Sequence, residues 1–461
     1  MYSHLNSPSF RPARGLASVA GISAALLLGA ALPASAQDKA TLDLLVKKGV
    51  ITQADADSVA KAAAVVAPKD AAVKKLQIEG LLQLQYDWIT TDDKAATTPA
   101  TPSPAATNQF FIRRAYFGAL ADLGNGWGGE VVLDFAATGA GQISAAPQAQ
   151  GTQNLFEKVI ITKKVEDWGT ATAGFQKVQY AFEENTPTAE LKPLERSLVT
   201  NYFTGPWGGA TTGRLGFGNR HSGLYWSGVV PAVDGLFYGV SVTNGIQSTT
   251  SFGNPGAGVA AYNEFAGWAN VGYGSKYGDF TYKLGLNIGY AGDANSTSGA
   301  AGVAPQNNSI WGYNPYATVS YAGFSLTGEF LQAQIDNGRV NGAGVTSRAA
   351  PYGFNLTPSY KIDDNWELVG RYSYLSTNGR GETVSQGIRN ASNPLVGGAF
   401  DTAWSLYGGV TYYIIGNSLK VSAGYEFAQY SDRFGGGTPG QSFTGPRANV
   451  SAIRTRIQLL F

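Results

Sequence analysis

The chain has 461 residues, of which 60 are glycine, 12% are aromatic and only 14% are charged. Soluble globular proteins average about 25% charged residues and about 7% glycine, so this composition is unusual for a soluble enzyme and ordinary for a β-barrel. Cysteine does not occur in the sequence, which excludes disulfide bonds, thiol catalysis and cysteine-based zinc sites. The net charge of +1 gives no electrostatic basis for nucleic-acid binding.

Residues 1–36 have the three parts of a secretory signal peptide. Arg11 and Arg14 supply the positive charge, residues 16–32 form an apolar run, and residues 34–36 (Ala-Ser-Ala) resemble a cleavage site. The run is short and ends in a cleavage pattern, which favours a signal peptide over a membrane anchor. The rest of the chain has no apolar run near 18 residues, so we expect a periplasmic, secreted or outer-membrane protein.

Residues 37–75 are rich in alanine and lysine, and their apolar residues recur at helical spacing. Two short helices are predicted, near 40–48 and 53–66. We interpret this segment as a periplasmic preface. It is either an element for oligomerisation or peptidoglycan contact, or a solvated spacer.

From residue 76 onward the period changes from that of a helix to that of a strand. In 279–291, for example, Tyr282, Leu284 and Leu286 alternate with polar or small residues. The segments run about 10–14 residues, twice the usual length of soluble strands, and several have aromatic residues near their ends. Sixteen such segments occur, near 76–90, 109–121, 127–137, 154–165, 169–178, 212–226, 234–244, 264–277, 279–291, 311–322, 323–334, 350–362, 365–378, 401–415, 418–430 and 449–461.

The connections between these segments alternate between long and short, as they do in bacterial outer-membrane barrels. In lipid every backbone polar group needs a partner, so a spanning sheet must close on itself. The sequence therefore predicts an all-β protein: a transmembrane antiparallel up-and-down β-barrel of 16 strands over residues 76–461, behind the helical preface. A barrel of this size is too wide for its side chains to fill, so it encloses an aqueous channel.

The longest connection, near 179–211, is charged and carries two prolines. We expect this third outer loop to fold into the lumen and narrow it, rather than to stand outside in solvent. Its candidate constriction residues are Glu183, Glu184, Lys192, Glu195 and Arg196.

Strand phase gives the pore wall, if the apolar set faces lipid. Basic and acidic residues are then nearly balanced inside, so selectivity would depend on the charges at the narrowest point. Arg113 and Arg114 are adjacent, and we expect one to face inward and the other to reach an interface. The candidate wall residues are Arg113, Lys283, Glu329, Arg371, Arg454 and Arg456.

Residues 108–116 (Asn-Gln-Phe-Phe-Ile-Arg-Arg-Ala-Tyr) resemble a strand of the phosphate-selective porin O and P family. Residues 174–177 (Gly-Phe-Gln-Lys), followed by Glu183-Glu184 and by 194–198 (Leu-Glu-Arg-Ser-Leu), are similar to its third-loop region. The resemblance covers roughly 75–461. It implies a trimeric outer-membrane channel, in which some members favour phosphate or pyrophosphate through arginine and lysine side chains along the pore. Residues 177–197 of this chain do not match such a basic ladder.

We therefore expect a porin for passive diffusion of small hydrophilic solutes and ions, with a preference for anions such as phosphate left open. The expected partners are outer-membrane lipid, lipopolysaccharide and two further copies of the chain; no nucleic acid, metal or cofactor is expected. A structural or adhesive surface protein is the alternative. A barrel enzyme such as a lipase is disfavoured because His221 and Ser222 are adjacent on a strand and point to opposite faces. We expect His221 at the membrane interface. A soluble sandwich is the alternative fold.

Overall fold

The computed structural model divides the chain into two units, Met1–Ala72 and Val73–Phe461. In the first unit, 46–47 and 53–54 are helical, and the rest of the two predicted helices lies outside the described residues. The predicted signal peptide also lies outside them. The structure describes residues 46–48, 52–54, 73–93, 105–138, 156–205, 211–244, 265–292, 309–340, 346–393, 398–434, 443–445 and 447–461.

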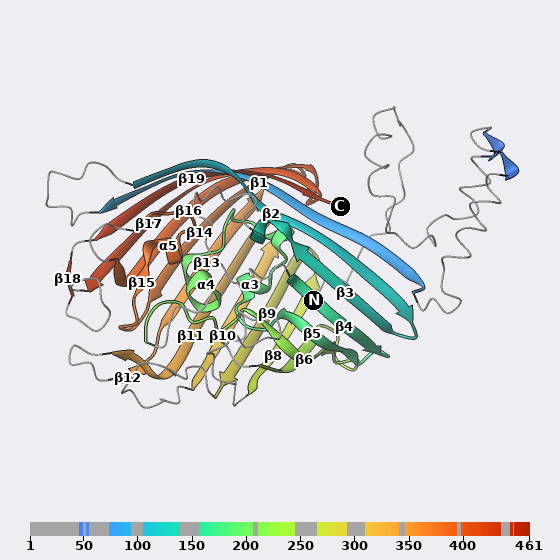
Figure 1. Ribbon diagram of the computed structural model, residues 1–461, viewed down its shortest axis with the longest axis horizontal. Coiled ribbons are helices and arrows are strands. Elements are labelled where there is room, and N and C mark those ends of the chain that lie inside the picture. Colours follow the sequence, from blue (N-terminus) through green and yellow to red (C-terminus); the bar gives the residue numbers. More distant parts are fainter. Residues whose placement is uncertain are drawn as a thin grey trace. The chain divides into compact units, whose positions relative to one another are not determined.

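The second unit is a closed antiparallel β-barrel, and its described residues form sixteen long strands (Figure 1). Three short strands, β12 (Thr346–Ala349), β15 (Glu382–Thr383) and β18 (Phe443–Gly445), extend outer connections. The long strands are β1 (Lys75–Asp93), β2 (Ala105–Gly124), β3 (Trp127–Asp134), β4 (Phe156–Val165), β5 (Gly169–Lys177), β6 (Arg220–Val229), β7 (Leu236–Asn244), β8 (Phe265–Tyr277), β9 (Phe280–Ala291), β10 (Ile310–Tyr321), β11 (Phe324–Val340), β13 (Tyr352–Lys361), β14 (Trp366–Ser376), β16 (Ala399–Ile415), β17 (Leu419–Phe434) and β19 (Ala448–Leu460).

The barrel closes because the first strand pairs with the last. β1 pairs with β2 on one side and with β19 on the other, from Leu81 opposite Leu460 to Asp93 opposite Ala448. No long strand is left with an unpaired edge among the described residues. The predicted sixteen-stranded barrel is confirmed.

The two faces of each strand differ as the alternating sequence requires. In β19, Ile453 and Ile457 are exposed on the outer face, whereas Arg454 and Arg456 are buried on the inner face. Aromatic side chains lie at the strand ends on the outside, as in the ring pair Trp366–Tyr412, with centroids 4.7 Å apart. This arrangement places the polar set in the lumen and the apolar set against lipid.

Tight turns join the strands at one end of the barrel. Asn125 and Gly126 both have positive φ (53° and 76°), as do Ala322 and Gly323 (48° and 84°). Two central residues of this kind match the right-handed twist of a two-residue hairpin. The connections at the other end are long, and none of the described helices is long and apolar enough to cross a membrane.

The largest difference between a predicted and an observed strand boundary is at the start of β6. The segment predicted as 212–226 becomes a strand only at Arg220. Leu215 and Phe217, which alternate with glycine, are fully buried inside the barrel as part of the third loop. The alternation of apolar residues in 212–226 indicates that one face of the segment is buried, but it does not show which element buries that face.

Candidate pore constriction

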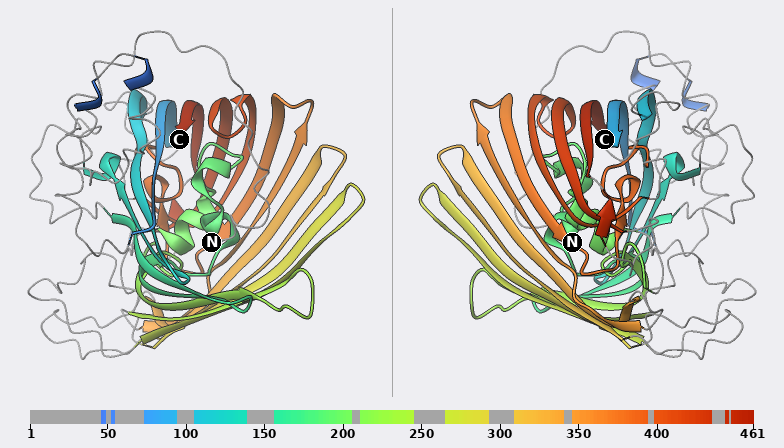
Figure 2. Two further views of the ribbon diagram at one scale, coloured as in Figure 1. Left: turned by 90° about the vertical axis from the view of Figure 1, so that its right-hand side faces the viewer. Right: turned by 90° about the vertical axis from the view of Figure 1, so that its left-hand side faces the viewer.

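The described residues of the third outer loop between β5 and β6, 178–205 and 211–219, lie inside the barrel. They contain α3 (Phe182–Asn185), the 3-10 helix η3 (Thr188–Glu190) and α4 (Leu198–Thr204). Both views of Figure 2 show these green elements within the ring of strands.

Apolar packing fixes one side of the third loop to the wall. Tyr180, Phe203 and Phe217 are fully buried, and the Phe217 ring lies 4.7 Å from that of Trp268 on β8. Burial of a large apolar side chain stabilises a fold by about 1.5–3 kcal/mol. Several such side chains together make the loop a fixed part of the bore.

Local hydrogen bonds shape the loop around α4. Ser197 caps this helix, because its Oγ accepts a hydrogen bond from the Thr200 backbone N–H at 3.0 Å. The Ser197 backbone N–H itself donates to Glu183 Oε2 at 2.9 Å. The returning segment then runs beside the helix, where the Leu215 N–H donates to the Tyr202 carbonyl at 2.9 Å.

Glu195 joins the third loop to β2 and β19, the two strands on either side of β1. Its carboxylate accepts from Arg113 of β2 through Nε (2.7 Å) and Nη2 (2.9 Å), and from Arg456 Nη2 of β19 (2.8 Å). Arg389 Nε lies 3.6 Å from the same carboxylate. Burial acts to raise the Glu195 pKa, but these arginines outweigh burial and hold it well below its usual range.

A second chain of ion pairs connects the loop to β14, β17 and β19. Arg371 Nη1 of β14 lies 2.9 Å from Glu183, and its Nη2 lies 3.1 Å from Glu426 of β17. Glu426 also pairs with Arg454 Nη1 at 3.2 Å. Arg371 is almost fully buried, so its charge needs these partners.

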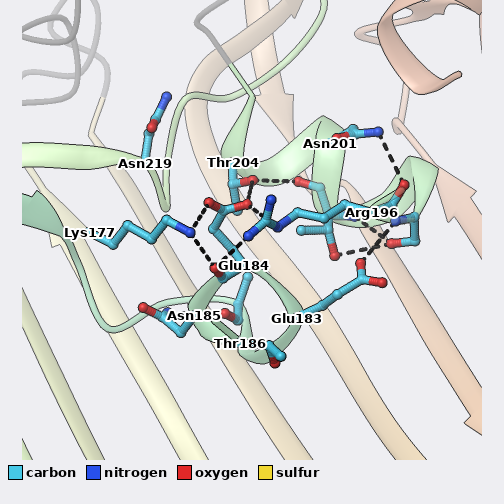
Figure 3. A network of polar contacts seen from close by, with 12 residues as sticks. Lys177, Glu183, Glu184, Asn185, Thr186, Arg196, Asn201, Thr204 and Asn219 are labelled. Carbon is cyan, nitrogen blue, oxygen red and sulfur yellow. Dashed lines mark hydrogen bonds and ion pairs between the residues drawn. The ribbon is translucent and has the colours of Figure 1, made fainter. Parts of the chain in front are cut away.

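The third group lies on the face of the loop toward β5. Glu184 Oε1 is 2.8 Å from Lys177 Nζ, and Oε2 is 2.7 Å from Arg196 Nε (Figure 3). Burial would raise the Glu184 pKa, but Arg196 and Lys177 together lower it to about 2. The carboxylate therefore stays charged at any physiological pH.

The remaining predicted residues also lie in the bore. Lys192 Nζ is 2.8 Å from Glu367 of β14, and Glu329 of β11 accepts the Phe182 backbone N–H at 2.9 Å. Lys283 Nζ of β9 lies 5.4 Å from the centroid of the Phe182 ring. Five of the six predicted wall residues thus contact the third loop, whereas Arg454 contacts wall residues and the seventh loop.

Arg113 and Arg114 both point into the lumen, so the prediction of one inward residue was wrong. In the pairing of β1 with β2, Gln83 lies opposite Arg114 and Leu84 lies opposite Ile112, which leaves Arg113 as an extra residue. Such a β-bulge breaks the strict alternation of faces. Arg114 Nη1 donates to Gln83 at 2.9 Å, while Arg113 reaches Glu195.

A second loop enters the bore, and the sequence did not lead us to expect it. Residues 377–393 of the seventh outer loop, between β14 and β16, carry α5 (Val384–Gly387), which packs on α4. Asn201 Nδ2 of α4 donates to the Gly387 carbonyl at 2.9 Å. Val384 and Ile388 are buried four residues apart in an otherwise polar segment, which was the available signal.

His221 is not at the membrane interface. It lies fully buried on the inner face of β6, with its ring 5.5 Å from that of Trp268 and Nδ1 3.3 Å from the Asn244 carbonyl. The apolar cluster under the third loop covers it, which corrects the prediction.

Comparison with known proteins agrees with the barrel fold. Among solved structures, the chain is similar to an anion-selective porin from Comamonas acidovorans at 12% identity, with a TM-score of 0.53 and 84% and 99% of the two chains covered. It is similar to the outer-membrane channel DcaP of Acinetobacter baumannii at 11% identity, with a TM-score of 0.53 and coverage of 86% and 99%. It is also similar to OprB of Pseudomonas putida at 15% identity, with a TM-score of 0.51 and coverage of 83% and 94%.

Those low identities show a shared fold. A search of curated proteins found no match. The profile of the family described as phosphate-selective porin O and P matches residues 103–461, well over half of the chain. The chain belongs to the phosphate-selective porin O and P family of outer-membrane porins.

Proposed function

We propose that this porin lets small hydrophilic solutes and ions diffuse passively across the outer membrane, through the part of the bore that the third loop leaves open. One observation carries the proposal: a charged loop lies inside a sixteen-stranded barrel and is held by ion pairs to β2, β5 and β14. A barrel of this width without the loop would be a broad aqueous channel. The loop narrows it with charged rather than only apolar groups.

The charges around Glu195 favour small anions such as phosphate over cations. Three arginines, Arg113, Arg389 and Arg456, face this one carboxylate. The local surplus of positive charge attracts an anion and repels a cation at the narrow point. Glu183, Glu184, Lys192 and Arg196 would define the rest of the constriction.

Liposome swelling tests the passive-diffusion proposal. Proteoliposomes should swell in small sugars at rates that fall steeply with sugar size, without any energy source. Liposomes with a heat-inactivated sample serve as the control. A folded protein that gives no swelling above this control would reject the proposal.

We also propose a homotrimer whose outer surface contacts lipid and lipopolysaccharide. Family membership supports the assembly, and exposed outward side chains such as Leu224 and Phe265 support the lipid contact. Chemical cross-linking in mild detergent should give a band at three times the mass of the chain. A band at one chain mass only would reject the trimer.

We also propose that export separates the signal peptide from the preface. Residues 1–36 would be removed on export, and 37–75 would stay in the periplasm. N-terminal sequencing of the protein from outer membranes should begin just after Ala36, and retention of Met1 would contradict this.

A further inference from the structure

The residues of the seventh loop just before and just after Arg389 are packed inside the bore. Ile388 and Ala391 are buried in the same apolar cluster as α4 of the third loop. Arg214 of the third loop also hydrogen-bonds the Gln386 carbonyl. The segment is therefore held by the third loop and not left in outer solvent.

The backbone at Arg389 is also tied to the wall. Arg454 Nη2 of β19 donates to the Arg389 carbonyl at 3.0 Å, and Asn390 Nδ2 donates to Asp87 Oδ2 of β1 at 2.9 Å. Thr107 Oγ1 of β2 donates to the Asn390 carbonyl at 2.8 Å. Three strands thus fix the point from which the Arg389 side chain leaves.

Among the three arginines around Glu195, Arg389 is the one that solvent reaches. Its side chain is 43% exposed, against 11% for Arg113 and 6% for Arg456. Its contact with Glu195 is also the longest, at 3.6 Å against 2.7 and 2.8 Å. The two shorter contacts already engage the carboxylate, so Arg389 has donors to offer a passing solute.

We propose that Arg389 determines the anion specificity of the pore: it is the cation that touches the permeating anion, while Arg113 and Arg456 hold Glu195 and position the site. The solute class is a small anion with a carboxylate-like or phosphate-like face, which a guanidinium binds through two donors. The inference rests on the proposed function, since it needs an open channel at the third loop.

The electrostatics of the site support this role. Repulsion from Arg113, together with partial desolvation inside the bore, lowers the Arg389 pKa to about 9. Arg389 therefore remains a cation at neutral pH, in surroundings where an anion relieves the repulsion between like charges.

Reversal potentials in a salt gradient test the assignment. We expect Arg389→Gln to lower the chloride-to-potassium permeability ratio at least fivefold, because one charge at about 4 Å in a water-like dielectric changes the permeability of chloride alone by about that factor. Arg389→Glu should lower it further, and Arg389→Lys should keep most of it because the charge remains. Inhibition of chloride current by inorganic phosphate should weaken least in Arg389→Lys, more in Arg389→Gln and most in Arg389→Glu.

Arg348→Gln is the matched control. Arg348 is exposed at the outer rim and pairs with Asp336 at 3.3 Å, away from the bore contacts. The chloride-to-potassium permeability ratio of Arg348→Gln should equal that of the unaltered porin. Heat-modifiable migration in gels verifies that each variant is folded. Unchanged reversal potentials in a conducting Arg389→Gln channel would overturn this inference and leave the porin function intact. Absence of conductance in the unaltered protein would instead overturn the proposed function.

Discussion

Glu195 and Arg113 form a two-armed ion pair that joins the third loop to β2, with Nε–Oε1 at 2.7 Å and Nη2–Oε2 at 2.9 Å. The β-bulge that turns Arg113 inward makes this geometry possible. The position of the loop in the bore therefore depends on an irregularity in the wall.

Replacing Glu195 with Gln should loosen the third loop and increase anion preference. The change leaves Arg113, Arg389 and Arg456 without their shared carboxylate, and breaking a buried pair costs about 3–5 kcal/mol, less where water enters. The temperature of the gel shift on heating should fall and current noise should rise. Glu166→Gln, in an exposed short turn, is the control, and equal behaviour of both variants would contradict the anchoring role.

Arg196→Glu should shift selectivity toward cations. Arg196 pairs with Glu184, so the substitution places two carboxylates together near Lys177 and reverses the local field. The permeability ratio of chloride to potassium should fall several-fold in a salt gradient. An unchanged reversal potential would remove Arg196 from the constriction.

The Glu184 group should resist acid. Its folded-state pKa is about 2, below its ordinary value of 4.5, so its ion pairs stabilise the loop above pH 4.5 and lose that effect as the pH falls through about 2. Single-channel noise should stay flat down to about pH 4 and rise nearer pH 2. A noise transition of the unaltered porin near pH 5 that Glu184→Gln abolishes would contradict this assignment.

Glu382 should act in the opposite direction. Neither carboxylate oxygen has a hydrogen-bond partner among the described residues, and burial, which outweighs the attraction of Arg214, raises its pKa from 4.5 to about 8. The folded state holds a proton that the unfolded state loses, so stability declines from about pH 4.5 to about pH 8. Glu382→Gln should remove this decline, by at most about 5 kcal/mol.

Heat-denaturation midpoints between pH 5 and pH 9 measure the Glu382 effect. The unaltered porin should lose stability over this range relative to Glu382→Gln. Asp336→Asn, at a half-exposed residue of the outer rim, controls for the change of charge. Parallel pH profiles for the porin and Glu382→Gln would show that burial of this carboxyl has no cost.

Much of the barrel could be predicted because its physics is local. The alternation of Ile453 and Ile457 with Arg454 and Arg456 shows which face meets lipid, and lipid forces closure. The charges of the third loop were also visible. The sequence predicts Glu183 and Glu195 as constriction residues, and both pair with wall arginines.

The missed features depend on contacts between distant segments. A bulge at Arg113 arises from pairing with β1, and the insertion of Ile388 depends on a site that α4 creates. Leu215 and Phe217 show the same limit, since their period of two fits a lipid face as well as a loop-covered one. Alternation in the sequence indicates that one face of a strand is buried. Which element packs against that face depends on the tertiary structure.

The most direct measurement is a planar-bilayer recording of the purified, heat-modifiable protein in potassium chloride, with phosphate added in competition. The account predicts stepwise, ohmic channels with anion preference, whose chloride current phosphate reduces. A folded barrel that inserts yet gives no conductance steps would contradict the claim that the third and seventh loops leave an open, charged passage.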